Sequence, residues 1–305
     1  MGRRGVHLLL LSLVMMWGLA FVAIKLALDH ASPLGLTVWR FVITASAFLL
    51  VMALRKEARA RIERGDLLRI AVMAVVGVGG YHFSINYGEQ FVSAGVASLI
   101  VAAMPVMVAL LAVRYLGETI TPTKGVGIAV AIVGVVVLTL FGTPGASLEV
   151  RSVTGALVIA LSPVCWSIYT VLGKPLVAKY GPLAITTTTM VAGTLLILPV
   201  GLPTALGEAG GYDASDWGWI AFLALASTVY AYIVWNYALS KIEASNTAAW
   251  VYPVPLVALF WGWILLGERL TPWVLVGGVL VLGGVILTER VAPRLARRDE
   301  ARVAA

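Results

Sequence analysis

Three ionisable side chains stand inside otherwise apolar stretches of the sequence: Lys25, Arg40 and His82. A charge among apolar residues is costly unless it has a partner or a task. A histidine titrates near neutral pH and suits proton handling, whereas a lysine or an arginine suits a substrate carboxylate. Each also has a structural interpretation: His82 as a neutral, hydrogen-bonded residue, and Lys25 and Arg40 as side chains that reach to a polar surface.

Aromatic residues accompany these charges. Trp17, Phe21 and Lys25 are spaced four residues apart and share one helix face, and Trp166 and Lys174 repeat the ends of that stripe 149 residues later. Such residues either pack a core or line a cavity for flat, partly apolar molecules. The candidate binding residues are His82, Tyr81, Trp17, Phe21, Trp166, Tyr169, Trp250, Tyr87, Arg40 and Lys25.

Four prolines fall within apolar segments and are expected to interrupt helices, where they free carbonyl groups and form hinges. They are Pro105, Pro163, Pro253 and Pro255. The sequence contains neither His-Glu-x-x-His nor Gly-x-Ser-x-Gly, and it has three histidines and one cysteine. We therefore expect no catalytic site, no metal, no cofactor and no disulfide.

The elements that position these residues must lie in lipid. The 305 residues are 60% hydrophobic and 12% charged, with a mean hydropathy of +0.96, and no soluble fold can hide so much apolar surface. Apolar segments of about 20 residues predict an all-α polytopic membrane protein with ten transmembrane helices. The predicted spans are His7–Leu26, taken as an uncleaved first helix, Leu36–Leu54, Leu68–Gly88, Ala94–Val113, Thr123–Phe141, Thr154–Gly173, Pro182–Pro203, Trp217–Leu239, Asn246–Leu266 and Trp273–Glu289.

The positive charges predict the orientation. Of the 22 Lys and Arg residues, Lys25 and Arg40 lie within predicted helices, and Arg151 and Arg269 fall in loops on one side. The other 18 fall on the opposite side, in alternate loops and at both termini. Since cytoplasmic loops are enriched in Lys and Arg, both termini are predicted to be cytoplasmic. The net charge of +7 is spread between apolar segments and does not indicate nucleic-acid binding.

The sequence contains an internal repeat. Residues 115–122 (YLGETITP) resemble residues 265–272 (LLGERLTP), an offset of 150 that also relates Asn86 to Asn236 and Pro105 to Pro255. Residues 1–145 and 150–290 are therefore predicted to be two five-helix repeats, followed by a basic cytoplasmic tail at 291–305. Five is an odd number, so the repeats must be inverted relative to each other. Inverted repeats around a central site are typical of transporters, although a duplication can also build a stable bundle without transport.

The repeated Gly-Glu-x-x-Thr-Pro block has a structural interpretation. Thr121 and Thr271 suit helix N-caps, the prolines suit first turns, and Glu118 and Glu268 place negative charge near helix starts. A gating role is the alternative. Gly127 and Gly134, with Gly277 and Gly284 in the second repeat, recur every seven residues and predict close helix packing.

Residues 91–105 (FVSAGVASLIVAAMP), continuing through Leu116–Pro122 to Gly127 and Gly134, resemble the EamA family of the drug/metabolite transporter superfamily. Trp17-Gly18 and Trp39-Arg40-Phe41 resemble it as well, so the resemblance covers nearly the whole chain. It implies a ten-helix fold with a central cavity and export of amino acids or other metabolites. Among the members of this family, the chain resembles most the aromatic amino-acid exporters of the YddG type.

These observations predict a multi-pass transporter of the bacterial inner (plasma) membrane that exports small metabolites, amino acids or aromatic amino acids among them, by alternating access. Nucleobases and amphipathic drugs are alternative substrates, and a channel or a non-transporting scaffold is the alternative class. The expected partners are the lipid bilayer and a small-molecule substrate, and a monomer suffices. We expect no acidic residue inside a helix, with Glu89 at a helix end, so that transport is facilitated or weakly coupled and His82 is the candidate proton carrier.

Overall fold

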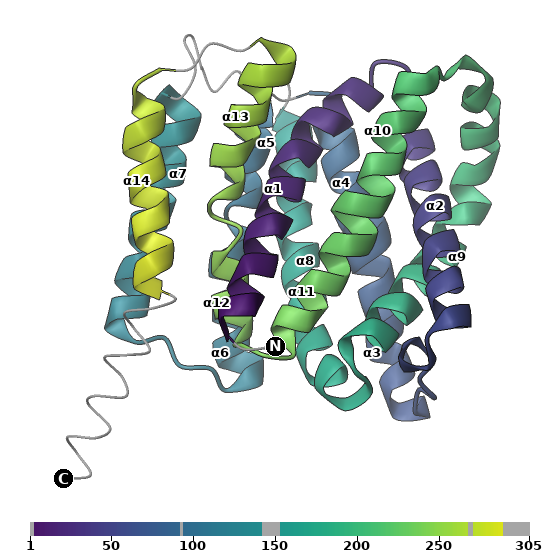
Figure 1. Ribbon diagram of the computed structural model, residues 1–305, viewed down its shortest axis with the longest axis horizontal. Coiled ribbons are helices and arrows are strands. Elements are labelled where there is room, and N and C mark those ends of the chain that lie inside the picture. The colour runs from purple at the N-terminus through teal and green to yellow at the C-terminus, as the bar shows by residue number, and fades with distance from the viewer. Residues whose placement is uncertain (1–2, 92–93, 142–152, 268–270, 289–305) are drawn as a thin grey trace.

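A computed structural model of the chain describes residues 3–91, 94–141, 153–267 and 271–288. The described part is a bundle of helices without strands (Figure 1). The first repeat holds α1 (Arg3–Ala27), α2 (Pro33–Leu54), η1 (Lys56–Ala58), η2 (Arg64–Asp66), α3 (Leu67–Ala74), η3 (Val75–Gly80), α4 (Tyr81–Gly88), α5 (Ala94–Val101), α6 (Met104–Leu116) and α7 (Pro122–Phe141). The second holds α8 (Val153–Tyr180), α9 (Pro182–Glu208), η4 (Ala209–Gly211), α10 (Ala214–Ala224), η5 (Leu225–Tyr230), α11 (Ala231–Leu239), α12 (Ala244–Ala249), α13 (Val254–Leu266) and α14 (Trp273–Ile286).

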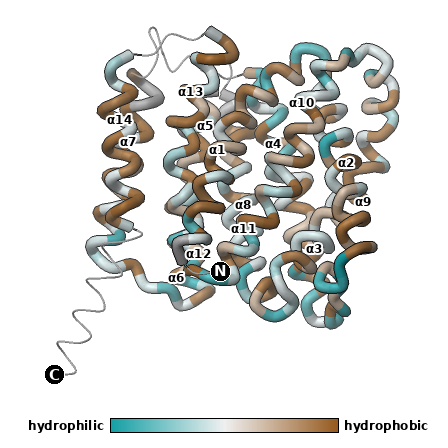
Figure 2. The backbone as a smooth tube through the Cα atoms, in the orientation of Figure 1, coloured by the Kyte–Doolittle hydropathy of each residue, from teal (hydrophilic) through white to brown (hydrophobic). Residues whose placement is uncertain are grey.

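The helices are apolar enough for a bilayer. Seven helical stretches have the length and composition of membrane spans, and three shorter apolar helices stand beside them at 104–116, 122–137 and 273–286. Figure 2 shows hydrophobic residues along the helices and hydrophilic ones gathered toward the two ends of the bundle. The multi-pass membrane fold is therefore confirmed, while ten complete crossings stay a prediction. The basic tail at 291–305 lies outside the described residues.

The two repeats match each other in backbone detail. Both contain a six-residue π-helical turn, η3 and η5, at an offset of 150 residues. Both α6 and α13 end at a glycine in the left-handed region, Gly117 with φ 68° and Gly267 with φ 66°, a conformation that glycine adopts without steric cost. The contacts between repeats also come in related pairs, since α6 packs on α8 as α13 packs on α1.

The repeats run in opposite directions. In Figure 1, α1 begins at the lower end of the bundle and α8 begins at the upper end. We use "lower end" for the end that holds the start of α1 and "upper end" for the other. The lower end carries the cluster of basic residues between α2 and α3, so the charge distribution predicts it to be cytoplasmic.

The predicted interruption at Pro163 is wrong. Helix α8 continues through Pro163 and Pro175 to Tyr180, well beyond its predicted end at Gly173, and Gly181 with φ 87° follows it. Lys174, expected in a loop, is thus helical and half-buried, and its Nζ donates to the carbonyls of Leu239 at 3.1 Å and Ile242 at 2.5 Å. These bonds between helices hold the last two turns of α8 against the end of α11.

The interruptions near the other prolines are present. Residues 102–103 separate α5 from α6, which has Pro105 in its first turn. Residues 250–253 separate α12 from α13, with Pro253 as the cap residue and Pro255 in the first turn. Proline has no N–H and is tolerated at a helix start, where that N–H would be unpaired anyway. Hinge motion at these sites stays a prediction.

A polar cluster joins the repeats at the lower end. Glu118 accepts hydrogen bonds from the backbone N–H groups of Ala244 at 2.6 Å and Ser245 at 3.1 Å, and from the Ser245 hydroxyl. Lys124 Nζ donates to Glu243 Oε2 at 2.8 Å and to Ser245 Oγ at 2.6 Å. We call these five residues the lower clasp. Glu118 therefore caps α12 of the other repeat, in addition to preceding α7, and the equivalent Glu268 lies outside the described residues.

The predicted N-cap is present at Thr121, whose hydroxyl accepts from the backbone N–H of Lys124 at 3.3 Å. Thr271 differs, because its hydroxyl donates to the carbonyl of Phe141 and so ties the start of α14 to the end of α7. At the upper end, His30 Nδ1 lies 3.1 Å from the Asp216 carboxylate, whose hydrogen bond and charge raise the pKa of His30. This pair holds the α1–α2 loop against α10.

Glycines bring α7 and α14 into direct backbone contact, as the seven-residue spacing predicted. A Cβ on Gly284 would lie 2.5 Å from the Gly127 carbonyl oxygen, and one on Gly134 would lie 2.8 Å from the Gly277 carbonyl oxygen. Without a hydrophobic driving force between helices in lipid, close van der Waals contact of this kind holds them together.

Gly284→Leu should force α7 and α14 apart and destabilise the protein by roughly 1–3 kcal/mol or more. The neighbouring Gly283 has no atom within 4 Å of its would-be Cβ, so Gly283→Leu is a matched control with little expected effect. Melting temperatures of both variants in detergent check this, and equal values would contradict the close-packed interface.

Lys124→Met should remove both hydrogen bonds of the buried ammonium group and loosen the lower clasp. The expected loss is about 1–3 kcal/mol of folding free energy. Lys241 is exposed on the same end, so Lys241→Met controls for a change of charge alone. Thermal unfolding in detergent measures the difference, and a melting temperature unchanged by Lys124→Met would show that the clasp contributes nothing to stability.

Candidate functional site

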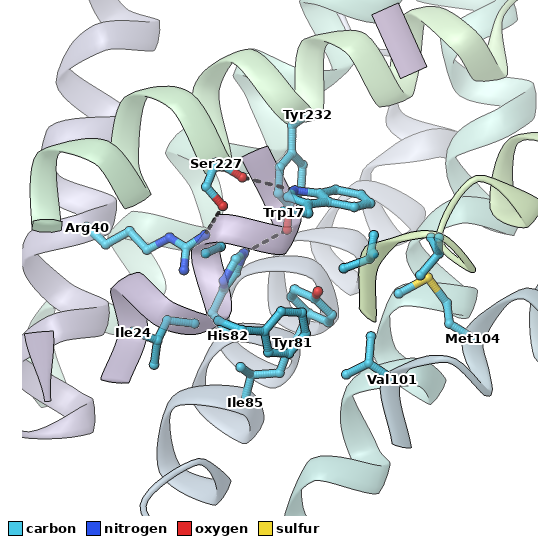
Figure 3. A pocket seen from close by; sticks show the side chains of 14 residues that line it. Trp17, Ile24, Arg40, Tyr81, His82, Ile85, Val101, Met104, Ser227 and Tyr232 are labelled. Carbon is cyan, nitrogen blue, oxygen red and sulfur yellow. Dashed lines mark hydrogen bonds between the residues drawn. The ribbon is translucent and has the colours of Figure 1, made fainter. Parts of the chain in front are cut away.

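A small cavity lies between the two repeats near the middle of the bundle (Figure 3). Its volume is about 30 Å³, room for about two water molecules and far below the ~300 Å³ or more of a typical small-molecule site. A metabolite therefore requires the surrounding helices to separate. The lining residues are Trp17, Ala20, Phe21, Ile24, Arg40, Tyr81, His82, Ile85, Val101, Met104, Ser227, Tyr232, Val251 and Val254.

Five of the ten predicted binding residues line this cavity: Trp17, Phe21, Arg40, Tyr81 and His82. They come from α1, α2 and α4, the first three crossings of the first repeat. Trp17 and Phe21, which their spacing of four residues placed on one face of α1, both line the cavity. The binding role of all ten residues stays a prediction.

The two repeats meet at a pair of equivalent residues beside the cavity. His82 and Tyr232 are related by the repeat offset of 150, and His82 Nε2 lies 2.9 Å from Tyr232 Oη. Trp17 and Trp166 are also repeat equivalents, and their rings contact edge to face with centroids 5.1 Å apart. The axis that relates the repeats therefore passes through these contacts, and the shared stripe on α1 and α8 lies at the interface of the repeats.

The π-helical turns supply acceptors for this interface. Tyr232 Oη donates to the Gly77 carbonyl at 2.8 Å, and Trp17 Nε1 donates to the Ser227 carbonyl at 3.2 Å. Gly77 and Ser227 occupy the same position in η3 and η5. A π-helical turn changes the hydrogen bonding of the backbone locally and is frequent at functional sites. Here each turn binds a side chain from the opposite repeat.

These bonds fix the tautomer of His82. The Tyr232 hydroxyl has one hydrogen, which it gives to Gly77, so its oxygen must accept from His82 Nε2–H. His82 Nδ1 then has a free lone pair, and no hydrogen-bond partner for it occurs in the described part of the chain. His82 is 3% exposed. It is thus held by a hydrogen bond, as its structural interpretation requires, and it also borders the cavity, as a functional role requires.

Arg40 brings a positive charge to the cavity. It is 3% exposed; its Nε donates to the Thr228 hydroxyl at 2.8 Å and its Nη2 contacts the Ser227 hydroxyl at 3.3 Å. No carboxylate of the described residues lies within 4.0 Å of its guanidinium group. A buried arginine normally pairs with an acid. Hydroxyl groups hold Arg40 in place without neutralising it, so its charge is available to an anion. It does not snorkel to the surface, which was its alternative interpretation.

Trp166 and Tyr169 form a second layer behind the cavity. Both are fully buried. The Trp166 ring contacts Tyr81, Tyr169, Tyr232 and Trp235 at centroid distances of 4.8–5.5 Å. They support the lining residues in this closed arrangement. Their contact with a substrate stays a prediction.

Three predicted residues lie away from the cavity. Lys25 is half-buried one turn beyond Phe21, near the end of α1. The Tyr87 ring packs between Phe83 and Phe91, on another face of α4. Trp250 lies in the interruption before α13 and its ring packs near His7 at 5.6 Å. Helix position alone could not distinguish these faces, because aromatic residues occur on several faces of these helices.

Sequence reasoning missed two polar lining residues, Ser227 and Tyr232. The signal was present in the repeat, because Tyr232 is the equivalent of His82 and residues near an inverted-repeat axis face their own equivalents. Ser227 follows in the same way from its position in η5. The small apolar residues that complete the lining carry no such signal.

Glu89 lies at a helix end, as predicted, but its burial was not anticipated. Glu89 is the cap residue of α4, as its predicted position implies, but it is 4% exposed. Neither of its carboxylate oxygens has a hydrogen-bond partner among the described residues. An acidic group is therefore buried within the bundle, near the upper end.

Comparisons with known proteins agree with this architecture. The model of the family described as "EamA-like transporter family" matches residues 4–140 and 153–290, once for each repeat. A protein of Archaeoglobus fulgidus named "Uncharacterized transporter" is 36% identical over 91% of this chain and 96% of its own length. One of Streptantibioticus cattleyicolor named "Probable terminal-alkyne amino-acid exporter" is 34% identical over 94% of both.

A solved crystal structure shares the fold, with a TM-score of 0.76 at 19% identity over 96% of this chain and 99% of that one. The family match covers nearly all of the described helices, and the relatives extend over the same length. The predicted resemblance is therefore confirmed: the chain belongs to the EamA-like transporter family and is a membrane transporter of small metabolites.

Proposed function

We propose that the protein is a secondary carrier that exports amino acids or closely related carboxylates by alternating access. The observation that carries the proposal is Arg40, a cavity-lining cation with no acidic partner among the described residues. A carboxylate of the substrate would complete the ion pair that the protein lacks. The name of the Streptantibioticus relative, an amino-acid exporter, agrees with this chemistry.

The rest of the lining favours an apolar or aromatic substrate side chain. Trp17, Phe21 and Tyr81 present rings to the cavity, and Val101, Met104 and Val254 add aliphatic surface. Aromatic and aliphatic walls with a few fixed polar groups are typical of small-molecule sites. A neutral amino acid with a large side chain matches both the charge of Arg40 and this surface.

Alternating access is supported by the inverted repeats and the small cavity. Two alike halves of opposite direction can exchange their conformations, which opens the site to each side in turn. The closed arrangement has no room for a metabolite, so transport requires a conformational change. A continuous channel is the competing class. The proposal includes ten crossings and cytoplasmic termini, which the charge distribution supports. It also includes residence in the plasma membrane, which the family supports.

Flux into proteoliposomes tests the proposal against a channel. Uptake of radiolabelled L-phenylalanine or L-leucine should saturate with concentration, and it should accelerate when the same unlabelled amino acid is present inside. A carrier with substrate on both sides exchanges faster than it returns empty. A linear, unaccelerated flux would favour a channel, and absence of flux for all neutral amino acids would refute the substrate class.

Arg40→Gln should weaken binding of a carboxylate substrate by roughly 30-fold or more, about 2 kcal/mol, because it removes the buried cation. Arg40→Lys retains the charge but loses the planar fork, so we expect an intermediate effect. Arg61 is exposed at the lower end, and Arg61→Gln serves as the control. Binding is measured by thermal shift against L-phenylalanine; unchanged affinity in Arg40→Gln would remove Arg40 from the site.

A further inference from the structure

Glu89 is the least compensated acidic group in the described part of the chain. It is 4% exposed and both its oxygens lack a hydrogen-bond partner. A bare carboxylate among apolar groups is costly, and ionisable residues retained in such places usually serve transport. Two other acids have the hydrogen-bond donors that Glu89 lacks. Glu118 accepts from three donors in the lower clasp. Glu208 accepts from the Ser32 N–H at 3.1 Å and from the Tyr212 hydroxyl at 2.8 Å.

The position of Glu89 connects it to the cavity. Ile85 lines the cavity, and Glu89 follows it by one helical turn on the same face of α4. Arg40 of α2 and Lys25 of α1 act electrostatically on the Glu89 carboxylate, but neither nitrogen group lies within 4.0 Å of it. Glu89 therefore lies one helical turn above the lining residue Ile85, toward the upper end, and does not itself line the cavity.

The other elements packed against this part of α4 offer no charge. Gly88 packs on Ile159 and Gly155 of α8, and the first eleven residues of α8, 153–163, contain no titratable side chain. The same holds for the six residues of η3. On α4 itself the other titratable groups are His82, Tyr81 and Tyr87. Arg40 and Lys25 are thus the charged groups that face Glu89 from neighbouring elements.

The repeat shows that this carboxylate is not part of the shared scaffold. The equivalent position in the second repeat is Leu239, whose carbonyl accepts from Lys174 Nζ. Lys25 is the equivalent of Lys174, yet no hydrogen bond of its ammonium group to Glu89 is present. The acid therefore occurs once, toward the upper end, which the charge distribution predicts to be outside.

We propose that the Glu89 carboxyl group alternately holds a proton and the ammonium group of an amino-acid substrate. In the closed, empty arrangement burial and the absence of a hydrogen-bond donor among the described residues favour the neutral acid, against the opposing charges of Lys25 and Arg40. When the helices separate, a zwitterion places its carboxylate at Arg40 and its ammonium group at Glu89, which supplies the missing donors. The Glu89 O–H bond breaks and the proton leaves to the medium, so the ammonium group replaces one proton.

This exchange couples export to proton entry. The carrier moves outward with the substrate bound and Glu89 ionised. It returns inward without substrate and with Glu89 protonated. One proton therefore enters for each amino acid that leaves. The inference rests on the proposed amino-acid substrate for its second half. Its first half, a protonated Glu89 in the empty protein, is independent of the substrate.

Infrared titration tests the first half without any substrate. The empty protein in lipid should show the carbonyl stretch of a protonated carboxylic acid, which disappears as the pH rises. Glu89→Gln should lack this band, while Glu208→Gln, which changes a hydrogen-bonded acid of the upper end, should retain it. If Glu89→Gln retains the band, or if the wild type never shows one, the proposal is overturned.

Proton release tests the second half. L-phenylalanine added to the weakly buffered, purified protein should release up to one proton per molecule bound, as measured with a pH indicator. N-acetyl-L-phenylalanine keeps the carboxylate but has no ammonium group, so it should bind without proton release. Glu89→Gln should bind L-phenylalanine more weakly and release no proton, and retained binding shows that the variant is folded.

The outcomes separate the two proposals. The infrared band without binding of any amino acid would reject the proposed substrate and keep Glu89 as a proton site. Equal proton release by wild type and Glu89→Gln, or release caused by the N-acetyl compound, would overturn the exchange at Glu89 while leaving amino-acid transport intact.

Discussion

Backbone polar groups inside a bilayer must find partners within the protein, because lipid offers none. The two π-helical turns, η3 and η5, change the backbone pairing of their helices at the middle of the bundle. Gly77 and Ser227 direct their carbonyls to side chains of the opposite repeat, Tyr232 and Trp17. The turns therefore serve as inter-repeat contacts. Tyr232, which donates to η3, also binds His82, and hydroxyl groups of η5 hold Arg40.

The sequence predicted most of the fold because the repeat and the hydropathy are global signals. The offset of 150 placed each helix of one half on a helix of the other, and the glycine spacing placed α7 against α14. Errors arose where tertiary contacts override local preference. Pro163 does not interrupt α8, since the helix is held on both sides by neighbours, and Lys174 is helical because the carbonyls of α11 bind its ammonium group.

The site was harder to predict, since residue type alone does not tell which face of a helix meets which neighbour. Arg40 and His82 were identified because ionisable groups are rare in apolar segments. Tyr87 and Trp250 looked similar by type and pack elsewhere. Glu89 was not among the candidates because it was predicted to lie at a helix end and not inside a helix. Its burial depends on the packing of α2 and α8 against α4, which no local pattern encodes.

The two ends of the bundle differ in their polar contacts, and in the proposed carrier this difference makes the two open conformations unequal in free energy. At the lower end Glu118 and Lys124 are satisfied by hydrogen bonds to the other repeat, and Lys174 by hydrogen bonds within its own repeat. At the upper end Glu89 and the neighbouring cations form no ion pair within 4.0 Å in the described residues. Inverted repeats of identical sequence would open to both sides with equal free energy. Opening the lower end would break the contacts of the lower clasp, and opening the upper end would break the His30–Asp216 pair. Because a ligand or a proton can supply the contacts that Glu89 lacks, binding events at the cavity bias one opening over the other.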